Sequence, residues 1–349
     1  MTDSASTLVP LLAKAVAGRD LTAAEAEAAL ARIVSGRASD VRTGALLAAL
    51  QTKGVAPSEV AGGVAALRGA MIPVPAPDPS SLVDACGTGG GRVSTFNIST
   101  AAAIVAAAGG VRVAKHGNRS FTSRSGSADV LEALGVAIEL SPESAAGVLA
   151  ETGIVFMFAP LHHPAVRHVA PVRKALGITT VMNLLGPLAN PAGARRQVVG
   201  VADPAFLDLV VRGLAALGHE RALVVHGEPG MDEISPCGPT RVSELRGGRV
   251  SAYEVTPGDF GVEPVPPESL AGGDPERNAA VVRAVLEGRE RGPARAAVLV
   301  NAAAVFMAAG RAESPSDGAV AAAEAIDSGA ADAMLDALVS ASRRAAGHA

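Results

Sequence analysis

Four short polar segments lie close together in the stretch of residues 84–129, and their residue types suit the binding of phosphate. They are Gly-Thr-Gly-Gly-Gly at 87–91, Asn-Ile-Ser-Thr at 97–100, Lys-His-Gly-Asn at 115–118 and the serine-rich segment 123–127. Glycine tolerates positive φ and has no side chain, so a phosphate oxygen can approach the backbone N–H groups closely. Together the segments predict a ligand that carries more than one phosphate group.

Apolar runs separate the polar segments, which places them at the ends of secondary structure elements. Ser99 and Thr100 precede an alanine-rich run and are predicted to cap a helix, whose exposed first N–H groups would form an anion site. Lys115 follows a strand predicted at 111–114 and adds a positive charge. Each segment alone is also explained as a turn or a cap, and the glycines match neither the P-loop nor the GxGxxG pattern. The phosphate interpretation depends on finding all four in one βαβ-sized window.

A pair of adjacent carboxylates, Asp232 and Glu233, follows a strand predicted at 222–225 and a loop at 226–230. Ligands of a parallel sheet gather at the carboxyl ends of its strands, so we expect this pair at the same edge as the glycine loop. Carboxylate oxygens are ligands of Mg²⁺, which often bridges phosphates. Taken alone, the pair is better explained as the acidic first turn of a helix. The independently inferred polyphosphate site favours the metal.

Helices alone are predicted for residues 1–72, and a stiff proline-rich linker follows at 73–79. Thr22 and Glu25 have the spacing of a capping box, and Pro57 suits the first turn of a later helix. The apolar stripe of these helices faces either a core or another subunit, and the sequence alone does not distinguish the two.

Strands and helices alternate beyond the linker, which predicts a mostly parallel sheet with helices on both faces. The expected strands are 111–114, 154–158, 197–201 and 222–225, and the expected helices are 128–134, 141–153, 164–176 and 204–217. A hairpin is expected at 240–245 and 250–255, and helices return at 275–340 with breaks at 288–292 and 310–316. The predicted fold class is therefore α/β, with a small all-helical domain beside a larger domain built on the sheet.

The composition excludes several classes of protein. The chain has 349 residues, a formal net charge of -4 and no basic tail, which argues against nucleic-acid binding. Its two cysteines, Cys86 and Cys237, form neither a disulfide framework nor a zinc-ligand spacing, so a reducing cytoplasm is expected. Cys86 is better explained as a small buried residue at the end of a strand than as a nucleophile. No signal peptide is apparent, and no apolar run approaches the about 18 residues of a membrane span.

The motifs, taken in order, resemble those of the anthranilate phosphoribosyltransferase family. The resemblance is carried by residues 87–90, 97–100, 115–120, 126–129, 163–165, 171–173, 183–188, 225–227 and 232–235, and it extends over nearly the whole chain. It implies a fold of the nucleoside phosphorylase/phosphoribosyltransferase type, similar to glycosyltransferase family 3. It also implies transfer of the phosphoribosyl group of phosphoribosyl pyrophosphate to the amine of anthranilate, with release of pyrophosphate, as a step of tryptophan biosynthesis.

The resemblance further implies roles for individual residues. Phosphoribosyl pyrophosphate is expected to contact Gly87, Thr88, Gly90, Gly91, Thr95, Asn97, Ile98, Ser99, Thr100, Lys115, Asn118, Arg119, Ser123 and Ser127. Anthranilate is expected at Gly87, His116, Asn118, Arg173 and Gly186, and Mg²⁺ at Ser99, Asp232 and Glu233. Lys115, His116 and Arg173 are the expected catalytic residues. Arg173 would hold the anthranilate carboxylate, and His116 is either a proton acceptor or a wall of the aromatic pocket.

The resemblance also implies a division of the chain and its partners. Residues 1–72, together with about 164–186, are expected to form the helical domain and the interface of a homodimer. Residues 73–163 and 187–349 are expected to form the catalytic domain. The expected partners are the two small-molecule substrates, with no nucleic acid and no membrane, and an association with anthranilate synthase stays open.

One position departs from the family pattern. Gly91-Arg92 stands where the family has Asp-Gly, so a carboxylate near the pyrophosphate and its metal is missing and a cation is added. A changed response to Mg²⁺ is therefore expected. Two other functions stay open: a different enzyme on this fold, such as a pyrimidine nucleoside phosphorylase or a transferase for another aromatic amine, and a binding protein without activity. The retained Lys115, Arg173 and Asp232 argue against the latter.

Overall fold

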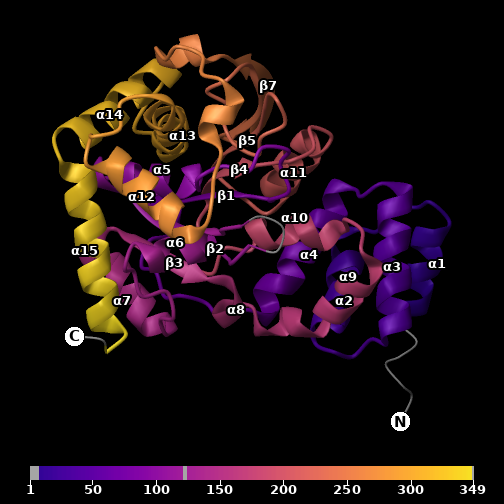
Figure 1. Ribbon diagram of the computed structural model, residues 1–349. Coiled ribbons are helices and arrows are strands. Elements are labelled where there is room, and N and C mark those ends of the chain that lie inside the picture. Colours follow the sequence, from indigo (N-terminus) through magenta and orange to yellow (C-terminus); the bar gives the residue numbers. More distant parts are fainter. Residues whose placement is uncertain (1–7, 121–123, 348–349) are drawn as a thin grey trace.

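The computed structural model describes residues 8–120 and 124–347, in which a helical bundle lies beside an α/β domain (Figure 1). The N-terminal helices of the bundle are α1 Leu8–Val16, α2 Ala23–Val34, α3 Asp40–Lys53 and α4 Pro57–Ala70. Local signals fix where they begin. Thr22 caps α2 in the predicted capping box with Glu25, Ser39 caps α3, and Pro57 occupies the first turn of α4.

A seven-stranded sheet forms the centre of the α/β domain, in the order β3-β2-β1-β4-β5-β6-β7. Its strands are β1 Leu82–Gly87, β2 Arg112–Gly117, β3 Ile154–Phe158, β4 Arg196–Gly200, β5 Arg221–Gly227, β6 Thr240–Arg246 and β7 Arg249–Val255. The strands from β3 to β5 pair in parallel, and β6 and β7 form the predicted antiparallel hairpin. The direction of winding reverses between β1 and β4, and ligands of open α/β sheets bind at the carboxyl ends of strands at such a point.

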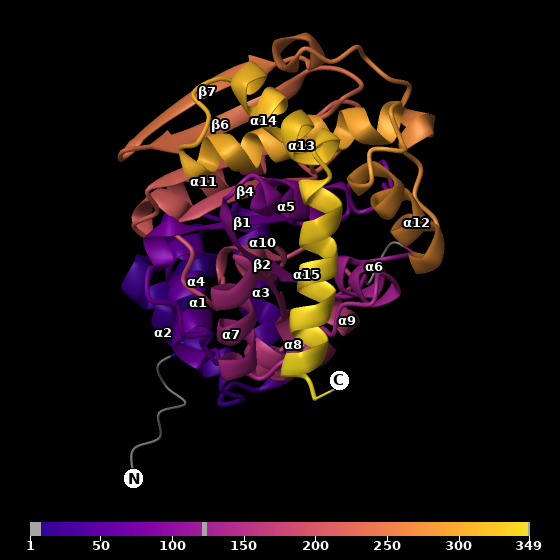
Figure 2. The same cartoon turned by 90° about the vertical axis from the view of Figure 1, so that its left-hand side faces the viewer.

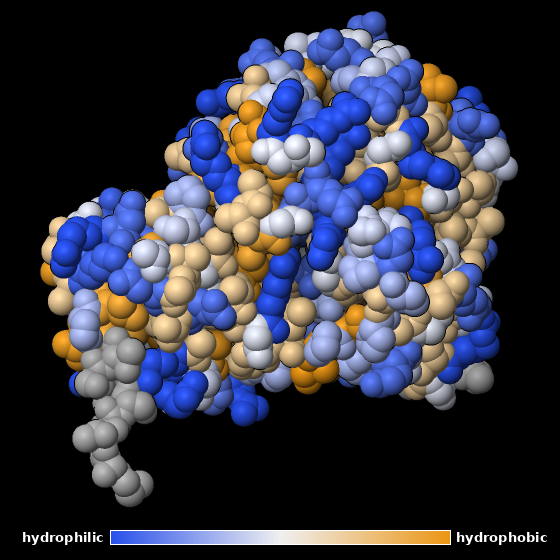
Figure 3. All heavy atoms as spheres, turned by 180° about the vertical axis from the view of Figure 1, so that it is seen from behind, coloured by the Kyte–Doolittle hydropathy of each residue, from blue (hydrophilic) through white to orange (hydrophobic). Residues whose placement is uncertain are grey.

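The remaining helices cover both faces of the sheet or, in the case of α9 and α10, pack against α3 and α4 of the bundle. They are α5 Ile98–Ala108, α6 Ser127–Ala133, α7 Pro142–Thr152, α8 Ala159–His162, α9 Ala170–Leu176, α10 Val181–Leu188, α11 Phe206–Ala216, α12 Pro275–Leu286, α13 Pro293–Ala309, α14 Pro315–Asp327 and α15 Ala330–Ala345. Figure 2 shows α15 running along the outside of the domain from α14 towards α7. Seen from behind, the bundle is the lower lobe beside a taller α/β lobe (Figure 3). None of the helices in the described part of the chain has the length and apolar character needed to cross a membrane.

The two faces of the sheet belong to two different cores. Successive residues of β5 alternate between them: Leu223 joins the core that contains α5 and α13, whereas Val224 joins a core shared with α11 and the helical bundle. The contact between α11 and the bundle is tight, because a Cβ on Gly213 of α11 would lie 2.7 Å from Cγ1 of Val60 on α4. The bundle therefore covers the sheet and shares its interior.

The helix predicted at 164–176 is confirmed only for its second half, because the chain breaks within it. A short 3-10 helix, Pro164–His168, is followed by the separate helix α9. Pro171 lies in the first turn of α9, where its missing N–H is tolerated, but its ring would clash with a preceding helical turn. The helix α10, which contains Pro187, was not expected from the sequence.

Two further boundaries differ at the phosphate segments. The strand predicted at 111–114 continues to Gly117, so Lys115 and His116 lie within β2, where parallel pairing with β3 extends to its end. The helix α5 is capped by Asn97, which has φ 69° and makes no side-chain capping bond. Ser99 and Thr100 are therefore residues of the first turn and not the caps that the sequence predicted.

Glu59 is a buried carboxylate that fastens the start of α4 to the loops around it. It is 0% exposed, accepts the N–H groups of Leu21 at 2.9 Å and Ala56 at 2.8 Å, and pairs with Lys53 Nζ at 2.8 Å. We expect Glu59→Ala to lower the free energy of unfolding by about 3–5 kcal/mol in urea denaturation, because it breaks a buried ion pair and leaves two N–H groups without an acceptor.

The control for this variant is Glu27→Ala on α2, whose side chain is exposed. Its effect on the free energy of unfolding should stay within about 0.5 kcal/mol. Equal stabilities of the two variants would show that the Glu59 contacts contribute little.

Candidate active site

The glycine loop after β1 is in contact with Asp232 at the carboxyl ends of β1 and β4. Oδ2 of Asp232 accepts a hydrogen bond from the Gly89 N–H at 2.9 Å, and the Thr88 N–H donates to the Gly200 carbonyl at 2.9 Å. A Cβ on Gly87 would lie 2.5 Å from Oδ2 of Asp232, and one on Gly200 would lie 1.6 Å from its carbonyl oxygen. Neither glycine can carry a side chain while Asp232 holds this position, so the close approach explains the residue type.

The first turn of α5 lies against Glu233. The Ser99 N–H donates to Oε1 of Glu233 at 3.2 Å, and Lys115 Nζ donates to Oγ of Ser99 at 3.3 Å and to the Ala85 carbonyl. Lys115 is only 4% exposed. Its charge is therefore held beneath the first turn of α5 and not at the open end of a strand, where it was predicted. Ser99 and Glu233 also line a small cavity with Asn301 of α13.

Asp232 and Glu233 are adjacent, partly buried carboxylates. Exclusion of water raises the pKa of both groups, and the negative charge of Asp232 raises the pKa of Glu233 further. A divalent cation would relieve this repulsion, and carboxylate and hydroxyl oxygens are suitable ligands for Mg²⁺. No group of three His, Cys, Asp or Glu side chains in residues 8–120 and 124–347 could hold a metal ion by itself. The pair with Ser99 thus fits a Mg²⁺ that takes its other ligands from water and substrate phosphates.

The rings of His116 and His163 lie together, with centroids 5.0 Å apart and planes tilted by 51°. Nε2 of each is buried and has no hydrogen-bond partner among the described residues. Burial lowers the pKa of His116 well below 6.5 and the pKa of His163 to about 4, so both rings are uncharged at neutral pH. The backbone of Gly186 is next to the His116 ring, and a Cβ on Gly186 would meet open space. His116 and Gly186 are therefore brought together.

Arg173 lies on α9, a short helix at the bundle side of the molecule (Figure 1). It is partly buried, and burial lowers its pKa. Its guanidinium makes no hydrogen bond or ion pair with any residue that the structure describes, and no such bond joins it to His116 or Asn118. Asn118 instead accepts the Arg119 N–H through Oδ1 at 2.7 Å. A partly desolvated cation without a protein partner suits an anionic ligand.

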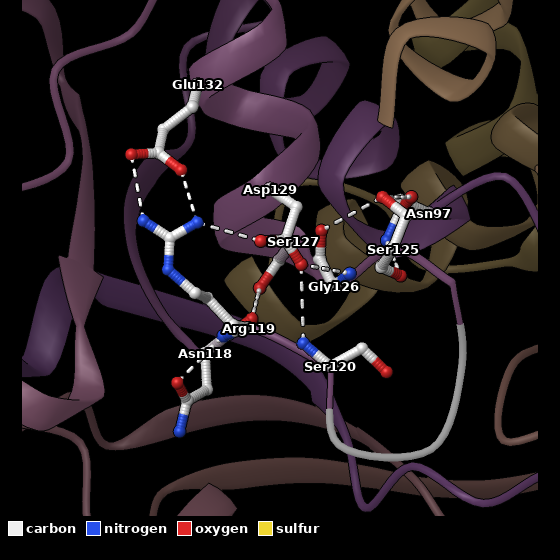
Figure 4. A network of polar contacts seen from close by, with 9 residues as sticks. All are labelled: Asn97, Asn118, Arg119, Ser120, Ser125, Gly126, Ser127, Asp129 and Glu132. Atoms are coloured by element: carbon white, nitrogen blue, oxygen red, sulfur yellow. Dashed lines mark hydrogen bonds and ion pairs between the residues drawn. The ribbon is translucent and has the colours of Figure 1, made fainter. Parts of the chain in front are cut away.

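Arg119 points towards Asp129 and Glu132 of α6 (Figure 4). Its guanidinium donates to Glu132 Oε1 at 2.9 Å and to Asp129 Oδ1 at 2.8 Å, so two carboxylates neutralise its charge. Asp129 also accepts the Gly126 N–H at 2.8 Å and thereby caps α6. The guanidinium that was predicted to contact phosphate is therefore already paired with carboxylates. Ser123, which was predicted to contact phosphate from the same loop, lies outside the described residues.

The remaining predicted contacts of phosphoribosyl pyrophosphate surround the start of α5. Ile98 and Thr100 are buried, at 0% and 1% exposure, so only their backbone groups can face a ligand. Gly90 is exposed with φ 81°, Thr95 pairs with Ala271 in an isolated bridge, Asn97 Nδ2 donates to the Ser125 carbonyl at 3.2 Å, and Ser127 Oγ donates to the Asn118 carbonyl at 3.3 Å. The loops that hold these residues are therefore tied to one another.

A buried carboxylate beneath the site was not predicted from the sequence. Asp84 of β1 is 0% exposed and accepts the His116 N–H at 3.1 Å, Asn190 Nδ2 at 2.8 Å and Gln197 Nε2 at 3.3 Å. Burial raises its pKa. A charged residue inside the apolar run 82–85 was the available signal. Asp84 joins β1 to β2 and β4 below the predicted anthranilate side.

Cys86 has the role that its position at the end of β1 suggested. Its thiol donates to the Pro187 carbonyl at 3.6 Å, and burial raises its pKa well above the ordinary value. A protonated thiol is a poor nucleophile, so the geometry agrees with a structural residue.

Comparisons with known proteins place the chain in a family. It matches the family described as "Glycosyl transferase family, helical bundle domain" over residues 9–71 and "Glycosyl transferase family, a/b domain" over residues 79–332. The anthranilate phosphoribosyltransferase of Rubrobacter xylanophilus is 53% identical over 336 residues, which cover 96% of this chain and 98% of the relative. That of Thermomicrobium roseum is 51% identical over 331 residues, or 94% and 95% of the two chains.

Solved structures agree with the sequence comparisons. The anthranilate phosphoribosyltransferase of Thermus thermophilus superposes with a TM-score of 0.90 at 46% identity, covering 95% of this chain and 99% of that one. The Saccharomyces cerevisiae enzyme in complex with PRPP and Mg has a TM-score of 0.88 at 26% identity, with 98% and 99% covered. The chain therefore belongs to the anthranilate phosphoribosyltransferases, the pentosyltransferases that move the phosphoribosyl group of phosphoribosyl pyrophosphate to the amine of anthranilate in tryptophan biosynthesis.

Proposed function

We propose that this chain binds phosphoribosyl pyrophosphate between the glycine loop after β1, the first turn of α5 and the Asp232–Glu233 pair. The observation that carries the proposal is the pair of hydrogen bonds from Gly89 N–H to Asp232 at 2.9 Å and from Ser99 N–H to Glu233 at 3.2 Å. These contacts gather backbone donors and two carboxylates at one edge of the sheet, where winding reverses. Because the Gly89 and Ser99 N–H groups donate to the carboxylates, other N–H groups of the loop and of the first turn of α5 would face the phosphates, and the carboxylates would face a cation.

The reaction is a displacement at the anomeric carbon of the ribose. The amine of anthranilate attacks this carbon as its bond to pyrophosphate breaks, and the bonding electrons leave with pyrophosphate. N–H groups of the glycine loop and of α5 stabilise the charge that develops on the leaving group, and Lys115 adds a buried positive charge below Ser99. Mg²⁺, held by Asp232, Glu233 and Ser99, would neutralise part of the same charge when bound. Positioning of the two substrates supplies much of the remaining rate acceleration.

The anthranilate site is proposed at His116, Gly186, Asn118 and Arg173, with Arg173 as the partner of the carboxylate. We assign His116 to the wall of the pocket and not to the base, because burial lowers its pKa well below 6.5 and makes it a weak proton acceptor. The proton of the attacking amine then passes to solvent. The Saccharomyces cerevisiae relative solved with 4-fluoroanthranilate supports an aromatic acid as the second substrate.

A homodimer formed through the helical bundle is also proposed. Val9 and Val16 on α1 and Val41 on α3 are exposed by 47%, 70% and 82%, and apolar surface is visible on the smaller lobe (Figure 3). Burial of such side chains against a second copy would stabilise the pair of chains. A cytoplasmic location is proposed because Cys86 and Cys237 are free thiols.

The test of the proposed function is release of pyrophosphate from phosphoribosyl pyrophosphate in a coupled assay. Release should depend on anthranilate, and uridine with phosphate should yield no uracil. Formation of uracil would identify the nucleoside phosphorylase alternative. Absence of both reactions, with phosphoribosyl pyrophosphate still bound in calorimetry, would identify a binding protein.

Gly91 is expected to set the response to Mg²⁺. A Cβ on Gly91 would lie 3.0 Å from Oδ1 of Asp232 and 3.2 Å from the Gly230 carbonyl, so an aspartate here adds a third carboxylate to the pair. We expect Gly91→Asp to shift the Mg²⁺ concentration at half-maximal activity by about threefold or more, because an added charge at this distance contributes kcal/mol-scale energies near a protein surface.

Gly91→Asn is the matched control for this titration, since it has nearly the same shape and no charge. It should follow the wild-type profile apart from a uniform loss of rate. Identical Mg²⁺ profiles for Gly91→Asp and Gly91→Asn would show that the missing carboxylate does not affect metal use.

A further inference from the structure

One polar side chain interrupts the apolar helix α13. Between Ala296 and Ala309 the helix contains only apolar residues apart from Asn301. Asn301 is 3% exposed, so its amide cannot be satisfied by bulk water and has to find partners within the protein. A buried polar residue in such a helix is costly unless its hydrogen bonds are made, which raises the question of what they hold.

The Asn301 amide pairs with both backbone groups of Ile234. Its Oδ1 accepts the Ile234 N–H at 2.9 Å, and its Nδ2 donates to the Ile234 carbonyl at 2.9 Å and to the Ala297 carbonyl at 2.9 Å. The side-chain amide therefore bonds to Ile234 as the backbone of a neighbouring strand would, with one hydrogen bond donated and one accepted. Ile234 directly follows Glu233, so this pair fixes the chain on the carboxyl side of the two carboxylates.

A second reciprocal pair fixes the chain on the amino side. The Met231 N–H donates to the Gly227 carbonyl at 2.7 Å, and the Gly227 N–H donates to the Met231 carbonyl at 3.0 Å. Asp232 and Glu233 are thus the two residues between two pairs of hydrogen bonds. The Gly227–Met231 pair is local, because Gly227 ends β5 only four residues before Met231. Asn301, by contrast, is 67 residues from Ile234 in sequence and belongs to the packed core.

We propose that Asn301 is a positioning residue that holds Asp232 and Glu233 in the orientation that binds a divalent cation together with phosphoribosyl pyrophosphate. The inference rests on the metal role proposed for that pair. Asn301 borders the same cavity as Ser99 and Glu233. Its two hydrogen bonds to Ile234, called the clamp from here on, therefore lie directly behind the carboxylates. Its loss would leave two buried backbone groups of Ile234 unpaired. The segment can satisfy them only by moving, and the two carboxylates move with it.

The variant that tests the proposal is Asn301→Leu, which keeps the approximate volume and removes all three hydrogen bonds. Mn²⁺ is the probe, because its free form is quantified by electron paramagnetic resonance in the presence of phosphoribosyl pyrophosphate. We expect Mn²⁺ binding to weaken by about tenfold or more, as for other residues that orient metal ligands. The KM for anthranilate at saturating phosphoribosyl pyrophosphate should stay within about twofold, since the effect is confined to the metal side.

Phe306→Leu is the matched control on the same helix. Phe306 is 2% exposed, and a Cβ on Gly109, at the far end of α5, would lie 2.3 Å from its ring, so the variant loses packing and keeps the Asn301 side chain that bonds to Ile234. Its Tm should fall through the cavity it creates, while Mn²⁺ binding stays at the wild-type value. A general loosening of α13 would weaken Mn²⁺ binding in both variants and would overturn the specific role of Asn301.

Asp232→Asn separates this proposal from the metal assignment beneath it. Weakened Mn²⁺ binding in Asp232→Asn and Asn301→Leu, but not in Phe306→Leu, supports the clamp. Loss in Asp232→Asn alone overturns the role of Asn301 and leaves the metal site in place. Wild-type binding in both variants overturns the metal assignment and the clamp together. We also expect the amide hydrogen of Ile234 to exchange faster in Asn301→Leu than in Phe306→Leu.

Discussion

Asp232→Ala is expected to lower kcat/KM for phosphoribosyl pyrophosphate by about 10³-fold, the largest loss for any single side chain of the site. Asp232 is one of the two proposed metal ligands, and its Oδ2 also accepts the Gly89 N–H at 2.9 Å. The variant therefore removes a charge that binds the cation and a contact that shapes the glycine loop. Initial rates over a range of phosphoribosyl pyrophosphate concentrations, at saturating anthranilate and Mg²⁺, measure the effect.

A matched acidic control is Asp259→Ala, remote from the glycine loop in sequence. Asp259 is exposed and accepts the Thr256 N–H at 2.7 Å, which caps the short 3-10 helix Pro257–Phe260. Its loss should cost roughly 1 kcal/mol of stability and leave kcat/KM unchanged. An Asp232→Ala enzyme within about tenfold of wild type would remove Asp232 from the proposed metal site, because a first ligand of a catalytic cation contributes several kcal/mol.

Arg173→Ala is expected to raise the KM for anthranilate by about 100-fold while the KM for phosphoribosyl pyrophosphate stays nearly constant. A charge-assisted arginine–carboxylate contact in a partly desolvated site contributes about 2–3 kcal/mol, which corresponds to this factor. Arg173 is partly buried and has no ion-pair partner in residues 8–120 and 124–347, so a substrate carboxylate would be its first. The same variant should lose most of the preference for anthranilate over aniline, which lacks the carboxylate.

Lys174→Ala provides the neighbouring cation as a control. Lys174 follows Arg173 on α9 and is exposed, so removing it changes the net charge equally and should leave both KM values within about twofold. A rise in the KM for phosphoribosyl pyrophosphate in Arg173→Ala would instead assign Arg173 to a phosphate. An unchanged ratio of anthranilate to aniline turnover would show that Arg173 does not recognise the carboxylate.

Residue types and the rules of parallel sheets were sufficient to place the glycine loop beside the acidic pair. Gly87 is the last residue of β1 and Asp232 lies in the loop after β5, and the carboxyl ends of parallel strands meet at one edge whatever the chain between them does. The helices and strands around this edge were predicted because their caps and breaks are local signals, as at Ser141 and Gly153, which cap the two ends of α7. Topology carried this part of the prediction.

The direction of individual side chains depends on packing that no local pattern records. Lys115 was expected at an open strand end, but pairing with β3 continues past it and the side chain turns beneath Ser99. Arg119 was expected at a phosphate, but Asp129 and Glu132 on α6 lie within reach and neutralise it. In both cases the sequence marked the cation and the helix that holds its partner, but not that the two side chains meet.

The partners of buried polar residues were also not predicted from the sequence. Asp84 and Asn301 sit in apolar runs, and a single polar residue in such a run has no predicted partner until the fold brings one. Their hydrogen bonds reach residues 106 and 67 positions away, respectively. The only sequence signal is the polar residue that interrupts the apolar run. At such a position an apolar side chain would suit the core, so a polar one indicates a buried hydrogen bond.

Because the bundle and the sheet share one core, residue changes in the two domains are expected to be coupled during evolution. Val60 of α4 fits against Gly213 of α11 with no room for a methyl group, and Val224 of β5 lies in the same core. A larger residue arising on one side can persist only if a smaller one arises opposite. Paired substitutions between α4 and α11 should therefore appear among descendants of this gene, and a bundle borrowed from a distant lineage would fit poorly unless its facing helix came with it.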